Sequence, residues 1–270
     1  MFLHRVIGQI KAQNWFMVGV DFLIVVFGVL IAFQITNWND ARKAKAQLAE
    51  AETVIKSDLF FNYVYAQERV TLKACRMERL RDLSNRLLEP GQTWIGMPIV
   101  DGSDRALDQV FRAANRPWRG RFWHAELARG TLNGMNANKR ENLDFIFKSS
   151  EDVWAQQNQI TEMAARLKPL STSMKLTQED RLHYLDIVSQ IDENSWWTEL
   201  KSSQLCAGIE SLGLKYDADE QERLLARVRD IIDLNLRKKQ YGECVRPVVM
   251  AIFNSGAGGM KSPCSSASYN

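Results

Sequence analysis

The sequence lacks the residue clusters on which most enzymes and metal proteins depend. Its three histidines, His4, His124 and His183, lie far apart and none is near a cysteine at ligand spacing. No CxxC or HExxH pattern, Gly-rich phosphate loop or dinucleotide fingerprint occurs. These absences argue against zinc ribbons, thioredoxin-like sites, helical zinc proteases and the common nucleotide-binding loops. We therefore expect no enzymatic activity, no cofactor and no metal.

Neither sign of charge dominates the chain. Its 35 Lys and Arg residues are nearly balanced by 32 Asp and Glu residues, which leaves a net charge of +3. Nucleic-acid-binding proteins concentrate Lys and Arg on one face, so the balance argues against a nucleic-acid partner. The hydrophobic share of 46% is ordinary for a chain with a packed core. A length of 270 residues allows one sizeable domain beside a membrane anchor.

One long apolar run is present, over residues 15–38. At 1.5 Å per residue a helix of this length spans about 34 Å, which matches the hydrocarbon core of a bilayer. Trp15 and Trp38 stand where interfacial aromatic residues are expected. A cleaved signal peptide has a shorter apolar core and a small-residue cleavage site, which this run does not offer. The sequence predicts a transmembrane helix that stays attached, with the lipid bilayer as its surroundings.

The basic residues that flank the span give no clear orientation. Arg5 and Lys11 precede it, and Arg42, Lys43 and Lys45 follow it. Segment 1–14 is amphipathic and basic, which suits a signal anchor left in the cytoplasm. We expect a cytoplasmic N-terminus, with the bulk of the chain in the periplasm of a bacterial inner membrane.

A carboxylate and several small residues share one stripe of the span. At helical spacing Asp21, Val25, Gly28 and Ala32 fall on one side, and Gly28 with Ala32 forms a small-xxx-small pair that lets two helices approach closely. Three interpretations of Asp21 remain open: a near-interface acid with local hydrogen bonds, a contact with another transmembrane helix, or part of an ion path. Gln34 is a further candidate for hydrogen bonding between helices.

The same stretch carries a resemblance. The run KAQNWFMVGVDFLIVVFGVLIAFQITNWND resembles the N-terminal signature of an uncharacterised family of bacterial single-span inner-membrane proteins, a pattern of KAQNWF, DF, Q and NWN. The resemblance covers about an eighth of the chain. It implies a single-span topology and a bacterial origin, but no reaction. The matching residues are Lys11, Ala12, Gln13, Asn14, Trp15, Phe16, Asp21, Phe22, Gln34, Asn37 and Trp38.

Beyond the span the pattern is helical throughout, so the predicted fold is all-α. Residues 39–89 contain no Gly or Pro and repeat apolar residues at helical spacing, which predicts a stalk helix continuous with the transmembrane helix. Residues 90–253 are expected to form a helical bundle, and the small, polar residues 254–270 a disordered tail. Within the bundle we expect helices over 104–115, 141–167, 177–191 and 220–241.

A weak internal repeat accompanies these helices. Trp123, Glu126, Leu127 and Leu132 recur 73 residues later as Trp196, Glu199, Leu200 and Leu205. The similarity is either a coincidence between amphipathic helix starts or the sign of two helix-turn-helix units that pack on the stalk.

Segment 115–126, NRPWRGRFWHAE, is the strongest candidate for a binding site. Arginine interleaved with tryptophan is typical of binding hot spots and anion sites. The alternative is a loop whose aromatic side chains fill the bundle while its arginines face water. His124 stands near Glu126, but no nucleophile accompanies them. The candidate partner- or anion-binding residues are Arg116, Trp118, Arg119, Arg121 and Trp123.

The four cysteines are Cys75, Cys206, Cys244 and Cys264. An even number is compatible with disulfides in an oxidising compartment and with buried thiols. If one disulfide forms, Cys206 with Cys244 is the expected pair, since both lie in the C-terminal region.

Together these features favour a non-enzymatic accessory, scaffold or assembly subunit of a larger membrane complex. Its expected partners are other transmembrane subunits, or further copies of the chain in a homo-oligomer. A membrane-anchored periplasmic sensor or binding module for an anionic ligand is the alternative, and an uncharacterised enzyme is the third.

Overall fold

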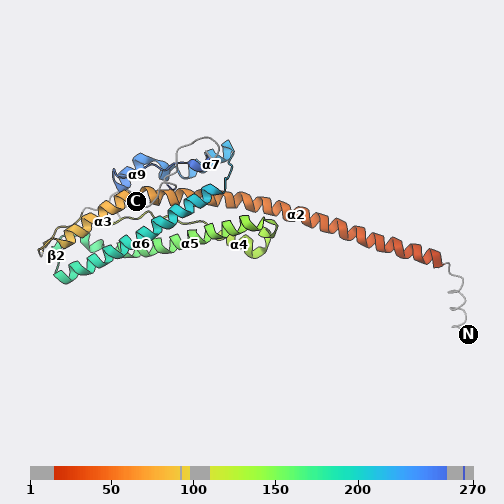
Figure 1. Cartoon of the computed structure of the whole chain (residues 1–270), viewed down its shortest axis with the longest axis horizontal. Coiled ribbons are helices and arrows are strands. Elements are labelled where there is room, and N and C mark those ends of the chain that lie inside the picture. Colours follow the sequence, from red (N-terminus) through yellow and green to blue (C-terminus); the bar gives the residue numbers. More distant parts are fainter. Residues whose placement is uncertain (1–14, 92, 98–109, 254–263, 265–270) are drawn as a thin grey trace, which may run out of the picture.

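The computed structural model describes residues 15–91, 93–97, 110–253 and 264. The described part is all-α, as predicted, and one long apolar N-terminal helix leads into a helical bundle. In Figure 1 the first half of that helix projects alone from the bundle. The predicted amphipathic segment 1–14 lies outside the described residues.

The N-terminal helix, α2 (Trp15–Thr71), is a single element of 57 residues, about 86 Å long. It ends at Thr71, and after the break at Leu72 the helix α3 (Lys73–Leu88) continues in the same general direction (Figure 1). Residues 19–50 are exposed or half-buried, but from Ala51 onward the helix belongs to the core. The predicted continuity of the stalk helix with the apolar segment is confirmed as far as Thr71. From Ala51 onward, however, the helix packs inside the bundle, so within the predicted stalk only residues 39–50 lie outside the core.

Residues 58–69 of α2 are buried on every side. The stretch DLFFNYVYAQER places large aromatic side chains around the whole helix, so no face is left for solvent. Figure 1 shows α5 and α6 along one side of α2 and α3, and α7 and α9 along the other. The main core cluster gathers Phe60, Phe61 and Tyr63 against residues from all of these neighbours except α9.

The longest pair of helices is α5 (Ala137–Arg166) and α6 (Gln178–Ser211), which form an antiparallel hairpin. Asn136 caps α5, accepting from the backbone N–H of Lys139. Thr177 and Asp180 form a capping box at the start of α6. The helices predicted over 141–167 and 177–191 therefore exist, but α6 runs twenty residues further than predicted.

Short elements close the end of this hairpin. The helix η2 (Lys168–Ser171) and strands β1 (Thr93–Trp94) and β2 (Met174–Lys175) lie there, with Thr93 opposite Lys175. Trp94 donates from Nε1 to the carbonyl of Leu170 at 2.8 Å. A Cβ on Gly96 would lie 2.4 Å from the carbonyl oxygen of Ser171, so only glycine fits there.

Before α5 come α4 (Arg121–Arg129) and η1 (Thr131–Gly134). Residues 110–115 are not helical, so the helix predicted over 104–115 is wrong in this part, and residues 104–109 lie outside the described residues. The predicted repeat is not structural either. Trp123 lies in the first turn of α4 and is fully buried, whereas Trp196 lies in the middle of α6 and is 41% exposed.

The C-terminal region is α7 (Ala218–Arg227), α8 (Arg229–Ile232), α9 (Leu234–Tyr241) and η3 (Ala251–Phe253). The single helix predicted over 220–241 is therefore wrong, because it breaks at Val228 and again at Asp233. Asp233 accepts from the backbone N–H groups of Asn235 and Leu236, which begins a new helix there.

Candidate functional sites on the apolar helix and in a pocket at the helix break

The apolar half of α2 is the one helix among the described residues that is long and apolar enough to cross a membrane. Its candidate window lies near the N-terminus and none of it is buried within the protein. Trp38 at its end is 66% exposed, and the side chain of Trp15 lies outside the described residues. This result rests on the length and composition of the helix.

The predicted packing stripe of this helix has no partner within the described part of the chain. Asp21, Val25, Gly28 and Ala32 are all exposed. No atom outside the helix lies within 4 Å of the position that a Cβ on Gly28 would take. Gln34 follows Asp21 by thirteen residues of continuous helix, which places it about 140° away around the axis. Gln34 therefore does not share the stripe.

The Arg/Trp segment lies against α2, and its arginines contact acids of that helix. Arg116 donates from Nε and Nη2 to the two carboxylate oxygens of Glu68, both at 3.0 Å, and Glu68 is fully buried. Burial lowers the pKa of Arg116, but the hydrogen bonds and charge of Glu68 raise it, and the pKa is raised overall. Arg119 lies 3.4 Å from Asp58 and over the ring of Phe61.

The tryptophans of the segment fill the bundle. Trp123 is fully buried, stacks on Phe147 and donates from Nε1 to Asp144 at 3.3 Å. Trp118 is half-buried and contacts Tyr65 edge to face. Arg121 alone of the five predicted residues is exposed. The tryptophans thus fill the bundle, as in the second interpretation of this segment. Arg116 and Arg119 differ from it, because they contact buried acids and do not face water.

His124 and Glu126 do not form a pair. The Nε2 of His124 lies 2.6 Å from Glu151, and Glu126 accepts from Arg129 at 2.6 Å. The first pair joins α4 to α5, and the second links residues one turn apart within α4.

The predicted disulfide between Cys206 and Cys244 is wrong. The bonds are Cys75–Cys244 and Cys206–Cys264, with sequence separations of 169 and 58. Cys244 follows α9 at the break between α2 and α3, where Cys75 lies, whereas Cys206 lies in the C-terminal third of α6. Proximity in sequence therefore does not bring Cys206 and Cys244 together.

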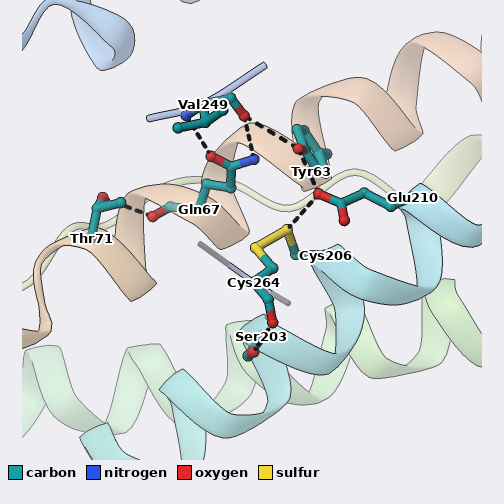
Figure 2. The surroundings of a disulfide bond; sticks show 8 residues. All are labelled: Tyr63, Gln67, Thr71, Ser203, Cys206, Glu210, Val249 and Cys264. Atoms are coloured by element: carbon teal, nitrogen blue, oxygen red, sulfur yellow. Dashed lines mark hydrogen bonds between the residues drawn. A yellow bond between two sulfur atoms is a disulfide. The ribbon is translucent and has the colours of Figure 1, made fainter. Parts of the chain in front are cut away.

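Figure 2 shows the surroundings of the Cys206–Cys264 bond. Ser203 donates to the carbonyl of Cys264 at 3.0 Å, and Tyr63 donates to Glu210 at 2.8 Å. Cys264 is buried, so the predicted disordered tail over 254–270 is wrong at this residue, and residues 254–263 and 265–270 lie outside the described residues. The two sulfurs and the carboxylate of Glu210 lie close together, but the sulfurs are bonded to each other and offer no thiolate to a metal.

A second set of contacts holds the C-terminal segment to α2. Gln67 donates from Nε2 to the carbonyl of Val249 at 2.6 Å and accepts from its N–H at 2.8 Å (Figure 2). Buried Arg237 donates to the carbonyls of Arg246 and Glu68 and to the hydroxyl of Thr71. The backbone N–H of Arg246 donates to the carbonyl of Thr71. The bonds to the carbonyls of Glu68 and Thr71 satisfy groups that α2 leaves free at its end.

A pocket of about 660 Å³ opens at this break. Its walls come from α3, residues 111–114, α5, α6 and the segment from α9 to the Cys75–Cys244 bond. Within this wall Arg76 donates to Glu199 and Asp192, both at 2.7 Å. Six basic and four acidic residues line the pocket: Arg69, Arg76, Arg79, Arg112, Lys238 and Lys239, with Glu78, Asp82, Glu199 and Glu243.

Burial shifts the pKa of several groups in this wall. Desolvation lowers the pKa of Arg69 to about 10, against the raising effect of the nearby charge of Glu68. Desolvation raises the pKa of Glu199, although the charge of Arg76 and its hydrogen bond lower it. Tyr241, next to these arginines, also has a raised pKa, chiefly because it is buried.

The sequence did not predict this pocket. The one sequence signal for it was Arg69 itself, a basic residue at the end of the stretch 58–69, which has apolar side chains on every face of the helix. Comparison of the chain with protein-family models, with curated proteins and with solved structures finds no match.

Proposed function

We propose that this protein is a non-enzymatic accessory or assembly subunit of a larger membrane complex, anchored by the apolar half of α2. The observation that carries the proposal is the stripe of Asp21, Val25, Gly28 and Ala32, which contacts nothing in the described chain. From Ala51 onward α2 packs in its own bundle, whereas the apolar part of the helix has no partner among the described residues.

The chemistry of the stripe supports a helical partner. A carboxylate at the centre of a span costs about 2.5–3.5 kcal/mol on insertion scales, and less near the ends. A neighbouring helix that offers a hydroxyl, an indole N–H or a basic side chain to Asp21 offsets that cost. Gly28 and Ala32 let the two backbones approach closely, which is how helices associate in a bilayer.

The proposed location is a bacterial inner membrane with the bulk of the chain in the periplasm. The two disulfides support an oxidising compartment for the bundle. A fusion at Asn270 keeps both disulfides in the chain. We expect alkaline phosphatase to be active there and a cytoplasmic fluorescent reporter to be dark; the reverse result would place the bundle in the cytoplasm.

Native purification tests the proposed partner. Tagged full-length protein is extracted from its own host cells in mild detergent, and co-purifying membrane proteins are quantified relative to the bait. We expect partners at fixed stoichiometry with the wild type and their loss from Gly28→Leu and Asp21→Leu. Leucine favours insertion, so loss of association is not explained by failure to enter the bilayer.

Gly19→Leu is the matched control. It makes the same substitution in the same helix, nine residues away and therefore on the opposite side, in equally open surroundings. Partners retained equally by all three variants would refute the packing stripe. A native mass that is a multiple of this chain alone would instead identify a homo-oligomer.

The sensor for an anionic ligand is the second candidate function. The Arg/Trp segment does not support it, because Arg116 and Arg119 already contact Glu68 and Asp58. The observation that favours it is the separate pocket at the helix break.

A further inference from the structure

Arg69 is a buried cation without a hydrogen-bond acceptor. Its side chain comes from the last turn of α2, is 7% exposed, and lines the pocket at the helix break. Within the described residues, neither its Nε nor its Nη2 has a hydrogen-bond partner. Arginine carries its charge and five N–H donors at every physiological pH. A buried charge in this condition is unfavourable unless something else completes its contacts.

Glu68, the neighbour of Arg69, and two acids of the pocket wall accept hydrogen bonds from other cations. Both oxygens of Glu68 accept from Arg116. On the pocket wall, Glu199 accepts from Arg76 and Glu243 from Lys238. What Arg69 does contact is the ring of Trp118, whose centre lies 5.5 Å from the guanidinium carbon. The pocket therefore keeps an excess of positive charge beside Arg69.

Ser195 is a second polar group of the same pocket without a partner. It is 4% exposed, and its Oγ makes no hydrogen bond within the described part of the protein. Phe111, Ile160 and the Cys75–Cys244 bond supply an apolar wall. A cavity of this volume, with an apolar wall on one part and polar groups on the rest, is typical of small-molecule sites.

The pocket is far from the apolar part of α2. Arg69 follows Trp38 by 31 residues of continuous helix, which corresponds to about 46 Å. A lipid headgroup at the end of the proposed span does not reach that far along the helix, so the matching ligand comes from solution.

We propose that this pocket binds a small organic carboxylate, whose anionic group contacts Arg69 and Ser195 and whose apolar body lies against Phe111 and Ile160. Arginine pairs with carboxylates through charge-assisted hydrogen bonds. The guanidinium of Arg69, whose Nε and Nη2 have no hydrogen-bond partner among the described residues, therefore favours an anionic group there. The proposal concerns the bundle alone and does not depend on the partner of the apolar helix.

Thermal melting of the full-length protein in detergent tests this site. The probes are acetate, hexanoate and phenylacetate at constant ionic strength, with phenylacetamide as the neutral analogue and anionic-lipid mixed micelles as the lipid arm. A ligand at 100 times its Kd raises the Tm of a protein of this size by roughly 5–10 °C. We expect the Tm to rise in the order acetate, hexanoate, phenylacetate, and not with phenylacetamide or the lipid.

Arg69→Met separates a binding role from a structural one. Methionine fills a similar volume without the buried charge, so we expect the Tm without ligand to be equal to or above that of the wild type and the carboxylate shift to vanish. Arg121→Met, the same substitution at an exposed residue outside the pocket, should keep the full shift. No rise with any carboxylate, or an undiminished rise in Arg69→Met, would overturn the proposal. A rise in Tm with the anionic lipid but with no carboxylate would overturn the soluble ligand and identify a lipid headgroup as the ligand of the pocket.

Discussion

Arg237 donates from Nη2 to the Oγ1 of Thr71 at 2.6 Å, across 166 residues of sequence. Both residues are buried, and Thr71 is the last residue of α2. The hydroxyl of Thr71 in turn donates to the carbonyls of Gln67 and Glu68. The end of the central helix is thus held by a side chain from α9, which explains why a long helix without proline breaks at Leu72.

Arg237→Met should destabilise the folded protein. It removes the donor to the carbonyl of Arg246 and two buried hydrogen bonds, to the carbonyl of Glu68 and the hydroxyl of Thr71, which keep their bond to each other. A hydrogen bond from a charged donor contributes about 1.5–3 kcal/mol. Burial lowers the pKa of Arg237, so removal of the charge returns part of this loss. We expect a net loss of about 2–4 kcal/mol in the free energy of unfolding, measured by denaturant titration in detergent.

Arg69→Met is the comparison for this prediction, since both arginines are buried near the same helix break. Arg237 has acceptors and Arg69 has none among the described residues, so only the first substitution should lower stability. Equal losses from the two variants would mean that hydrogen bonding does not distinguish them.

The all-α fold was predictable because helical periodicity is a local signal. The central position of α2 was also present in the sequence, since residues 58–67 have apolar side chains on every face of the helix, which is typical of a helix surrounded by neighbours. A stalk in solvent would need a polar face there. The stalk was predicted from the number of residues in the helical pattern, without regard to how many faces of the helix are apolar.

The disulfides and the pocket depend on distant contacts that local patterns do not specify. Cys264 lies in a stretch rich in Gly and Ser, a composition that is typical of disorder. The sequence therefore did not indicate that Cys264 forms a disulfide with Cys206 of α6. Arg116 and Arg119 look like free binding arginines in sequence, because their acceptors Glu68 and Asp58 are 48 and 61 residues away. Both arginines form ion pairs in the folded protein, whereas the Nε and Nη2 of Arg69 have no hydrogen-bond partner among the described residues.

Removal of either disulfide should lower the stability of the bundle. In the chain-entropy model, cross-links that close loops of 169 and 58 residues stabilise by roughly 5 and 4 kcal/mol, and measured values are usually somewhat smaller. We expect Cys75→Ala with Cys244→Ala to lose at least as much as Cys206→Ala with Cys264→Ala. The measurement is the midpoint of denaturant unfolding.

Two controls accompany the disulfide variants. Thiol labelling under denaturing conditions should find no reactive cysteine in the oxidised wild type, and reduction before unfolding should lower its midpoint towards those of the variants. A midpoint that neither substitution nor reduction changes would show that these cross-links do not stabilise the fold.

Glu199 gives the protein a pH dependence whose direction follows from its surroundings. Its Oε1 accepts from Arg76 at 2.7 Å, and its buried Oε2 has no partner within the described residues. Desolvation raises its pKa above the ordinary value of 4.5, despite the opposing charge of Arg76. Since the folded state then holds this proton more tightly than the unfolded state, the stabilising contribution is complete below about pH 4.5 and is lost as the pH rises through the raised pKa.

Glu199→Gln should therefore behave like the permanently protonated acid. Relative to the wild type, the variant should gain stability as the pH is raised from 4 to 7, because only the wild type must then bury a carboxylate. The difference in the free energy of unfolding between the two proteins isolates Glu199 from the other acids that titrate over this range. Glu193→Gln, on the exposed side of the same helix, controls for the loss of one carboxylate from α6. If the free energy of unfolding of the wild type instead rises relative to that of Glu199→Gln as the pH rises, the ion pair with Arg76 outweighs the burial of Glu199.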